Sequence, residues 1–209
     1  PTPAILPSQI ETMALLQGKV ALITGASRGI GKSIAQRFVQ EGATVAFTYR
    51  SSEEKAQALE KELTASGGTA KGFKSDAGSL EQSEALVKDV VEAFGTVDIL
   101  INNTGGPAAG PASASDPQVF LDAFQMHLVN AQTMLQTFLP GMKENSFGRV
   151  VNIISTSVIT PIPGLGVSNT IRGAVANWGR TVAAELGPFG ITVNNVLPGF
   201  TATARLSSL

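Results

Sequence analysis

Apolar residues in this chain alternate between short unbroken runs and longer stretches with a helical period. The short runs are rich in β-branched residues and apolar at successive positions, which is typical of parallel strands buried on both faces. They predict strands at residues 19–24, 43–49, 69–75, 97–103, 148–155 and 191–197. We expect helices on both sides of the sheet to cover these strands.

The stretches between the runs predict amphipathic helices. In the first stretch, apolar side chains recur one turn apart at Ile30, Ile34 and Phe38. In the third stretch they follow the i, i+3, i+4, i+7 rule at Val87, Val90, Val91 and Phe94. The last stretch predicts a long helix from about residue 166 to residue 186, with Val175, Trp178, Val182 and Leu186 at helical spacing.

Capping boxes predict where three of the helices begin. In such a box, a serine caps the helix and a Glu or Gln three residues later reaches back to it. The matching pairs are Ser51 with Glu54, Ser79 with Gln82, and Ser115 with Gln118. They place helix starts after the second, third and fourth strands.

Six strand–helix units with short connections predict the fold class. Such an order forms an α/β, doubly wound parallel sheet of the Rossmann type, with three layers (α/β/α) and at least six parallel strands. We assign residues 14–209 to one domain. Residues 1–13 hold three prolines and no clear period, so we interpret them as an N-terminal arm or an expression remnant.

Composition excludes several classes of function. The net charge is −1 and the basic residues are scattered, which argues against nucleic-acid or membrane-surface binding. The chain has no cysteine and one histidine, so we expect no disulfide and no metal site. Its apolar runs are shorter than the roughly 18 to 20 residues of a membrane span. We expect a cytoplasmic protein.

The first predicted strand leads into the sequence TGASRGIG at residues 24–31. Gly25, Gly29 and Gly31 allow a tight turn and a close approach of the backbone to a ligand, and the following helix start attracts anions. The spacing Gly-x-x-x-Gly-x-Gly indicates a dinucleotide diphosphate site. The alternative is a strand-to-helix turn that needs glycine only for packing.

Further motifs follow in order: SDAG at residues 75–78, NNTG at 102–105, NIIS at 152–155 and VNNVLPGFTAT at 193–203. With these motifs the chain resembles the short-chain dehydrogenase/reductase family, specifically its branch of 3-oxoacyl-ACP-reductase-like proteins. The resemblance covers about residues 18–206. Relatives in this family usually continue into a substrate-covering flap and a last strand, which we expect to be absent from this sequence.

The resemblance implies a set of cofactor-binding residues. Along the diphosphate and ribose it implies Gly25, Ser27, Gly29, Ile30 and Gly31. At the adenine and the cofactor ribose it implies Asp76, Ala77, Asn103, Thr104 and Gly105. At the nicotinamide end it implies Pro198, Gly199 and Thr203.

The segment after the second strand points to the type of nicotinamide cofactor. An NAD site usually has a carboxylate there that binds the ribose hydroxyls. Here the first acid is Glu53, and Arg50 stands at that place, with Arg28 inside the glycine turn. Arginine binds phosphate with a bidentate fork, so we predict NADP(H) rather than NAD(H). The alternative is that both arginines are only solvated.

The resemblance also implies a catalytic set of serine, tyrosine, lysine and asparagine. The serine position is Ser155, but the tyrosine position holds Ser168 and the lysine position Arg172. The asparagine position is His127, although Asn130 is three residues away and a shift of register would select it. A serine hydroxyl is a far weaker acid than a phenol, and arginine keeps its proton. The resemblance therefore implies a reductase whose proton donor is replaced.

Two hypotheses of function follow, besides a structural subunit that binds no cofactor, against which the complete glycine turn argues. The first is an NADP(H)-dependent oxidoreductase that transfers hydride between the nicotinamide and a carbonyl or alcohol carbon, with low turnover. Its substrate is a small carbonyl compound, with an acyl thioester as one candidate. The second is a non-catalytic dinucleotide-binding protein that acts as a sensor or subunit partner. In both cases the resemblance implies a homo-oligomer, a dimer or tetramer paired through the helices after the fourth and fifth strands.

Overall fold

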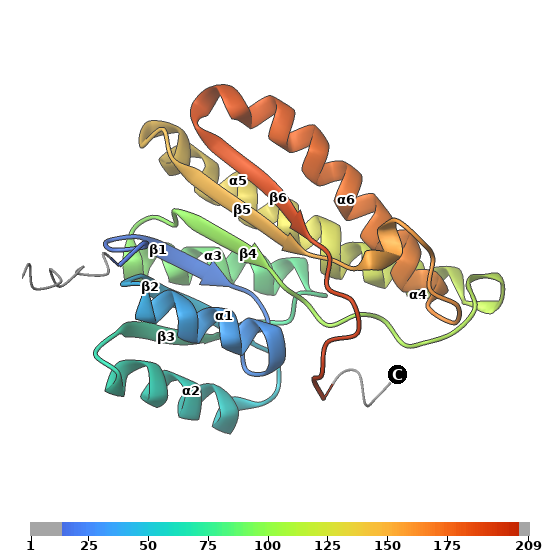
Figure 1. Cartoon of the computed structure of the whole chain (residues 1–209), viewed down its shortest axis with the longest axis horizontal. Coiled ribbons are helices and arrows are strands. Elements are labelled where there is room, and N and C mark those ends of the chain that lie inside the picture. The colour runs from blue at the N-terminus through green and yellow to red at the C-terminus, as the bar shows by residue number, and fades with distance from the viewer. Residues whose placement is uncertain (1–13, 205–209) are drawn as a thin grey trace, which may run out of the picture.

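The computed structural model describes residues 14–204, which form one six-stranded parallel sheet flanked by helices (Figure 1). The strands are β1 (Val20–Ile23), β2 (Thr44–Tyr49), β3 (Thr69–Lys74), β4 (Ile99–Asn102), β5 (Gly148–Ile153) and β6 (Ile191–Val196). The α-helices are α1 (Gly29–Gln40), α2 (Glu53–Ala65), α3 (Leu80–Phe94), α4 (Pro117–Phe124), α5 (Asn130–Glu144) and α6 (Gly166–Leu186). Short helical turns are η1 (Ala112–Ala114), η2 (Gln125–Val129), η3 (Thr156–Val158) and η4 (Gly187–Phe189).

The strand order is β3-β2-β1-β4-β5-β6, so the direction of winding reverses between β1 and β4. In open parallel sheets, ligands bind outside the carboxyl ends of the strands at such a reversal. The predicted doubly wound sheet is therefore confirmed, and its topology points to the end of β1 and β4 as the place for a site.

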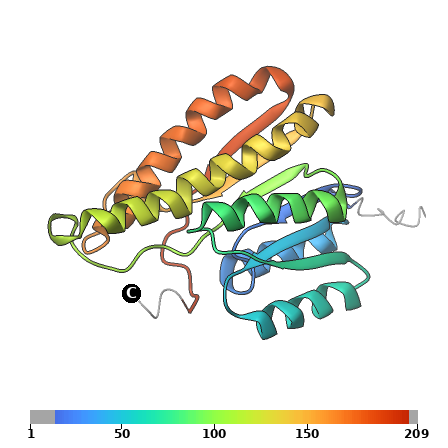
Figure 2. The same ribbon diagram turned by 180° about the vertical axis from the view of Figure 1, so that it is seen from behind.

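The two faces of the sheet are covered by different helices. Along β1, Leu22 packs with α3, α5 and α6, whereas Ala21 and Ile23 pack with α1 and α2. This division follows from the alternation of side chains along a strand. Figure 2 shows α3 and α5 crossing the face that is turned away from the viewer in Figure 1.

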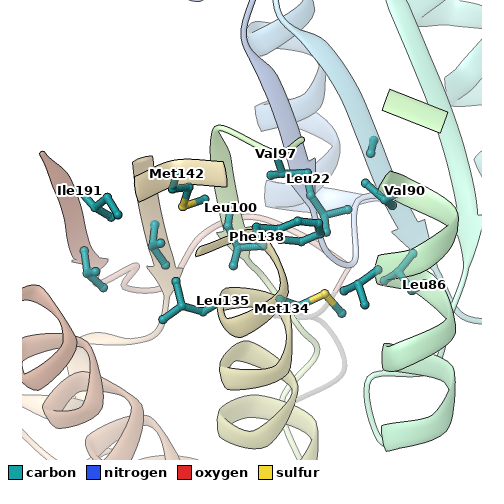
Figure 3. Packing of buried hydrophobic residues seen from close by; sticks show 14 of the residues in the cluster. Leu22, Leu86, Val90, Val97, Leu100, Met134, Leu135, Phe138, Met142 and Ile191 are labelled. Carbon is teal, nitrogen blue, oxygen red and sulfur yellow. The ribbon is translucent and has the colours of Figure 1, made fainter. Parts of the chain in front are cut away.

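The larger core lies beneath α3, α5 and α6. In Figure 3, Phe138 and Met134 of α5 lie close to Leu22 of β1, Leu100 of β4 and Leu86 of α3, and all five side chains are buried. The helical pattern of α3 also predicted Val91 in the core, which is wrong: 40% of that residue is exposed. The buried stripe of α3 is narrower than the i, i+3, i+4, i+7 rule assumes.

β6 departs from the prediction that every strand is covered on both faces. Ile191 and Val193 are buried under α6, but Thr192, Asn194 and Val196 on the opposite face are exposed. Within residues 14–204 no helix covers that face of β6, so the three-layer arrangement applies to the rest of the sheet.

The capping predictions are confirmed for one helix of three. Ser79 caps α3, with its Oγ accepting the Gln82 backbone N–H over 3.2 Å. In α2 the N-cap is Ser52 instead of Ser51, and it makes no side-chain cap bond. In α4 the cap is Asp116, because its carboxylate accepts the Gln118 N–H over 2.7 Å, while Ser115 donates to the Pro111 carbonyl. Neighbouring polar residues compete for a cap, and the pattern alone does not select among them.

The long helix α6 spans Gly166–Leu186, as predicted. Its residues Val175, Val182 and Leu186 are buried against the sheet and the neighbouring elements. They are therefore not available to pair with another subunit. Within residues 14–204 no helix is long and apolar enough to cross a membrane. The same residues contain no group of His, Asp and Glu side chains that could hold a metal ion.

Candidate active site

A cavity of about 570 Å³ opens at the carboxyl ends of the strands, where the sheet reverses its winding. It is lined by residues from the glycine turn, from the ends of β2, β4 and β5, from the start of α6 and from the segment after β6. All the predicted site residues line it except Gly31 and His127. The fold thus brings together motifs that are far apart in the sequence.

The glycine turn is held from behind by the NNTG segment. The Asn103 side chain donates to the Thr24 and Gly25 carbonyl oxygens over 3.0 and 3.1 Å. A Cβ atom at Gly31 would lie 2.7 Å from Asn103 Nδ2 and 2.7 Å from the Gly25 carbonyl oxygen. Gly31 is therefore required for packing between α1 and the turn. Gly25 has a φ of 63° and donates its N–H to Thr48 Oγ1 over 2.9 Å.

The structure adds a supporting role to the cofactor roles predicted for Asn103 and Gly31. Both side-chain protons of the Asn103 amide are donated to the turn itself, so this residue shapes the cradle that a diphosphate would meet. Gly31 lies beneath the turn, outside the cavity lining. Packing requires glycine at Gly31 and also at Gly25, where an added Cβ would overlap the Asn103 carbonyl oxygen. Gly29, with a φ of 57°, and Gly105 line the cavity, and a Cβ at Gly105 would meet nothing within 4 Å.

Arginines dominate the charge of the cavity. Arg28 and Arg50 are exposed at the end that also carries the glycine turn and the carboxyl end of β2, and Arg172 lines the other end. The only carboxylate in the lining is Asp76, and its Oδ1 accepts the Gly78 N–H over 3.0 Å. A ligand with several negative charges fits this distribution.

At the other end of the cavity, Ser155, Ser168 and Arg172 lie together. Arg172 Nε donates to Ser168 Oγ over 3.2 Å, and Nη1 donates to the carbonyl oxygens of Ile153 and Ile154, each over 3.0 Å. The guanidinium thus connects the first turn of α6 to the end of β5, directly before Ser155. Tyr49 is the only tyrosine of the chain and stands beside Arg50, at the opposite end.

His127 lies behind the cavity, on η2. It is 8% exposed, and its Nδ1 is 2.8 Å from Thr104 Oγ1, while Nε2 has no partner among residues 14–204. Burial and, to a smaller extent, the charge of Arg172 lower the pKa of His127 from 6.5 to about 3, although a backbone hydrogen bond with Gly105 acts in the opposite direction. The imidazole is neutral at physiological pH. Asn130 is also buried, and its Oδ1 accepts from Ser83 over 2.8 Å.

Comparison with known proteins assigns the family. The model of the short chain dehydrogenase family matches residues 19–209. The chain belongs to this family. A 3-oxoacyl-[acyl-carrier-protein] reductase, FabG, of Staphylococcus aureus is 33% identical over 193 residues, which are 91% of this chain and 78% of the relative.

Solved structures of other family members share the fold of this short-chain dehydrogenase. A variant actinorhodin polyketide ketoreductase with NADPH has a TM-score of 0.85 at 36% identity, covering 91% of this chain and 73% of that one. A short chain dehydrogenase from Burkholderia cenocepacia in complex with NADP has a TM-score of 0.81 at 35% identity. The match covers 91% of this chain and 78% of that one. The resemblance noted from the motifs and the oxidoreductase class that it implies are confirmed.

Sequence reasoning missed the apolar wall of the site. Met126, Ile162, Leu165 and Phe200 line the cavity, and 77% of Phe200 is exposed. Ile162 and Leu165 lie in a loop without periodicity, so no pattern marks them. That loop is fixed to the segment after β4 by the Gly110 N–H, which donates to the Gly164 carbonyl over 2.6 Å. Thr48, which supports Gly25, was missed because it lies within a strand pattern.

Proposed function

We propose that this short-chain dehydrogenase binds NADP(H) in the cavity and slowly transfers hydride between it and a carbonyl or alcohol carbon. The observation that carries the proposal is the lining of the cavity, whose charged side chains are three arginines and a single, internally hydrogen-bonded carboxylate. Two family members with 35–36% identity are solved with NADP or NADPH, which supports the same cofactor here.

The residues of the chain suit the parts of this cofactor. The turn at Gly25–Gly29 offers backbone N–H groups and the start of α1 to the diphosphate. Arg28 and Arg50 would bind the ribose phosphate, and their guanidinium forks match its geometry. Pro198, Gly199 and Thr203 would lie along the nicotinamide end, with Ser155 donating to the substrate oxygen. When bound, the reduced cofactor supplies the hydride.

Calorimetry on both cofactors tests the NADP(H) assignment. We expect NADPH to bind more tightly than NADH, and Arg50→Ala to remove most of the difference. Arg180→Ala, an exposed arginine of α6 that does not line the cavity, is the matched control and should leave the ratio unchanged. Equal affinities in the wild type, or an unchanged ratio in Arg50→Ala, contradict the assignment.

The alternative is a non-catalytic dinucleotide-binding protein. It is favoured by the side chains near the end of β5. There Ser168 and Arg172 of α6 stand at the positions of the implied tyrosine and lysine, and Arg172 is hydrogen-bonded to the protein. Neither delivers a proton near neutral pH, and loss of a general acid typically costs about 10² to 10⁴ in rate.

The double variant Ser168→Tyr with Arg172→Lys distinguishes the two functions. If the cavity is built for reduction, restoring the phenol and the amine should raise ketone reductase activity by about tenfold or more. A double variant that binds NADPH with wild-type affinity but gains no activity favours the non-catalytic protein. Robust wild-type turnover on simple ketones contradicts the claim that Ser168 limits the rate.

For the substrate we propose a small carbonyl compound, with a 3-oxoacyl thioester as one candidate because the FabG relative is a 3-oxoacyl-[acyl-carrier-protein] reductase. We also propose a homo-oligomer, a dimer or tetramer. It is supported by α4, which exposes 63% and 40% of the apolar residues Leu121 and Phe124, three positions apart and therefore on one side of the helix. Clusters of exposed apolar side chains commonly mark protein interfaces.

A further inference from the structure

The hydroxyls of Ser155 and Ser168 share an unusual hydrogen-bonding state. The Ser157 backbone N–H donates to Ser155 Oγ over 3.0 Å, and Arg172 Nε donates to Ser168 Oγ over 3.2 Å. Within residues 14–204 neither hydroxyl donates a hydrogen bond to a protein acceptor. Each serine hydroxyl has one proton to donate. In both serines this proton is therefore available for a hydrogen bond to a ligand in the cavity that they line.

Arg172 fixes the two donors relative to each other. Ser168 and Arg172 are one turn apart on α6, so their side chains lie on the same side of the helix. The same guanidinium is bound to the carbonyl oxygens of Ile153 and Ile154, which directly precede Ser155. A hydroxyl that accepts from a cation also becomes a stronger donor, because hydrogen bonds in a chain polarise one another.

We propose that Ser155 and Ser168 form a paired donor site for the oxyanion that develops on a substrate carbonyl, and that this site selects electron-poor carbonyl compounds such as quinones and vicinal diketones. This inference rests on the proposed function, since it needs a nicotinamide beside the pair. Met126, Ile162 and Leu165 add an apolar wall that suits a planar ring.

The preference for electron-poor carbonyl compounds follows because the two serines stabilise an oxyanion but do not protonate it. In a diketone the carbonyl carbon receives the hydride, and in a quinone the ring carbon conjugated to the carbonyl receives it. In both cases the π-electron pair moves onto the carbonyl oxygen, with oxidation of the reduced nicotinamide in the same step. Two hydroxyl donors stabilise that negative charge, and one such donor is typically worth about 10² to 10³ in rate. They do not hand over a proton, so the oxyanion takes it from water and hydroxide is released. A weakly basic oxyanion can wait for a proton from water, whereas a simple alkoxide cannot. Such oxyanions are the enolate formed from a quinone, which becomes a hydroquinone when a ring proton shifts to oxygen, and the alkoxide beside the second carbonyl of a diketone.

Binding of 4-nitrophenolate to the protein with NADP⁺ tests the donor pair without turnover. The phenolate mimics the oxyanion, and its absorbance reports binding. We expect Ser168→Ala and Ser155→Ala each to weaken phenolate binding by about tenfold or more, the usual worth of a hydrogen bond to a charged group. Thr170→Ala is the matched control on the same helix, because its hydroxyl donates to the Gly166 carbonyl and is exposed. It should bind phenolate as the wild type does.

Two results overturn the donor pair: unchanged phenolate affinity in Ser168→Ala, or an equal loss in Thr170→Ala. Calorimetry with NADP⁺ on the same proteins separates this failure from failure of the proposed function. Absent NADP⁺ binding in the wild type refutes the proposed function. Normal NADP⁺ binding with no effect of Ser168→Ala refutes only the inference about the pair.

A substrate series tests the selectivity. With NADPH present, kcat/KM for a quinone should exceed that for a simple cyclic ketone of similar size by about 100-fold or more, after subtraction of the rate without protein. The ratio should shrink at least about tenfold in the Ser168→Tyr, Arg172→Lys variant, because a general acid removes the dependence on oxyanion basicity. The proposed selectivity is overturned if the wild type has equal kcat/KM for the quinone and the ketone. It is also overturned if the quinone-to-ketone ratio of kcat/KM is unchanged in the double variant.

Discussion

Replacing His127 with asparagine should remove most of the pH dependence of stability between pH 7 and pH 5. In the folded protein, burial and the charge of Arg172 lower the pKa of His127 from 6.5 to about 3. Below the unfolded pKa, the unfolded chain takes up a proton that the folded protein does not bind. The free energy of unfolding is therefore fully retained above about pH 6.5 and declines as the pH falls toward about 3.

The size of this effect follows from linkage. Each pH unit within the window costs up to about 1.4 kcal/mol, and the loss is gradual near the unfolded pKa. Between pH 7 and pH 5 the wild type should therefore lose about 2 kcal/mol through this residue. Because only 8% of His127 is exposed, solvent screening reduces the value little.

Urea unfolding at the two pH values, followed by fluorescence of the single tryptophan, measures the loss. The comparison uses the change with pH within each protein, so any difference in basal stability between wild type and His127→Asn cancels. His127 is the only histidine of the chain, so no other imidazole contributes to the pH dependence. The reasoning is refuted if His127→Asn loses as much free energy between pH 7 and pH 5 as the wild type does.

Three further predictions concern packing, capping and assembly. Gly31→Ala should lower the free energy of unfolding by about 1 to 3 kcal/mol, because the added Cβ would overlap Asn103 and the Gly25 carbonyl. Gly173→Ala is the control and should not lower the free energy of unfolding, because a Cβ there meets nothing within 4 Å. Thermal denaturation compares the two variants. Ser79→Ala should cost about 1 kcal/mol in urea unfolding through loss of the α3 cap, and an unchanged midpoint contradicts the cap. Light scattering at micromolar concentration should give a dimer or tetramer, and a monomer rejects the proposed pairing through α4.

Local signals in the sequence determined the elements and the family. The alternation of apolar runs and helical periods predicted all six strands, and α6 has the predicted bounds of Gly166–Leu186. The motifs from the glycine turn to the segment after β6 predicted the cofactor end, because parallel strands in a doubly wound sheet bring their carboxyl ends to one edge. These features depend on residues within a few positions of one another, so a single sequence contains them.

Other features were decided only by contacts between distant residues. Asn103 and Gly31 support the turn because strand order places β4 beside β1. The exposed face of β6 depends on which helices reach it, and the low pKa of His127 depends on burial beside Arg172. The hydrogen bonds from Arg172 to Ile153 and Ile154 join α6 to β5 across the site. The sequence placed Ser168 and Arg172 at the positions of the missing phenol and amine, but only the fold showed that Arg172 binds Ser168 and the carbonyl oxygens of Ile153 and Ile154.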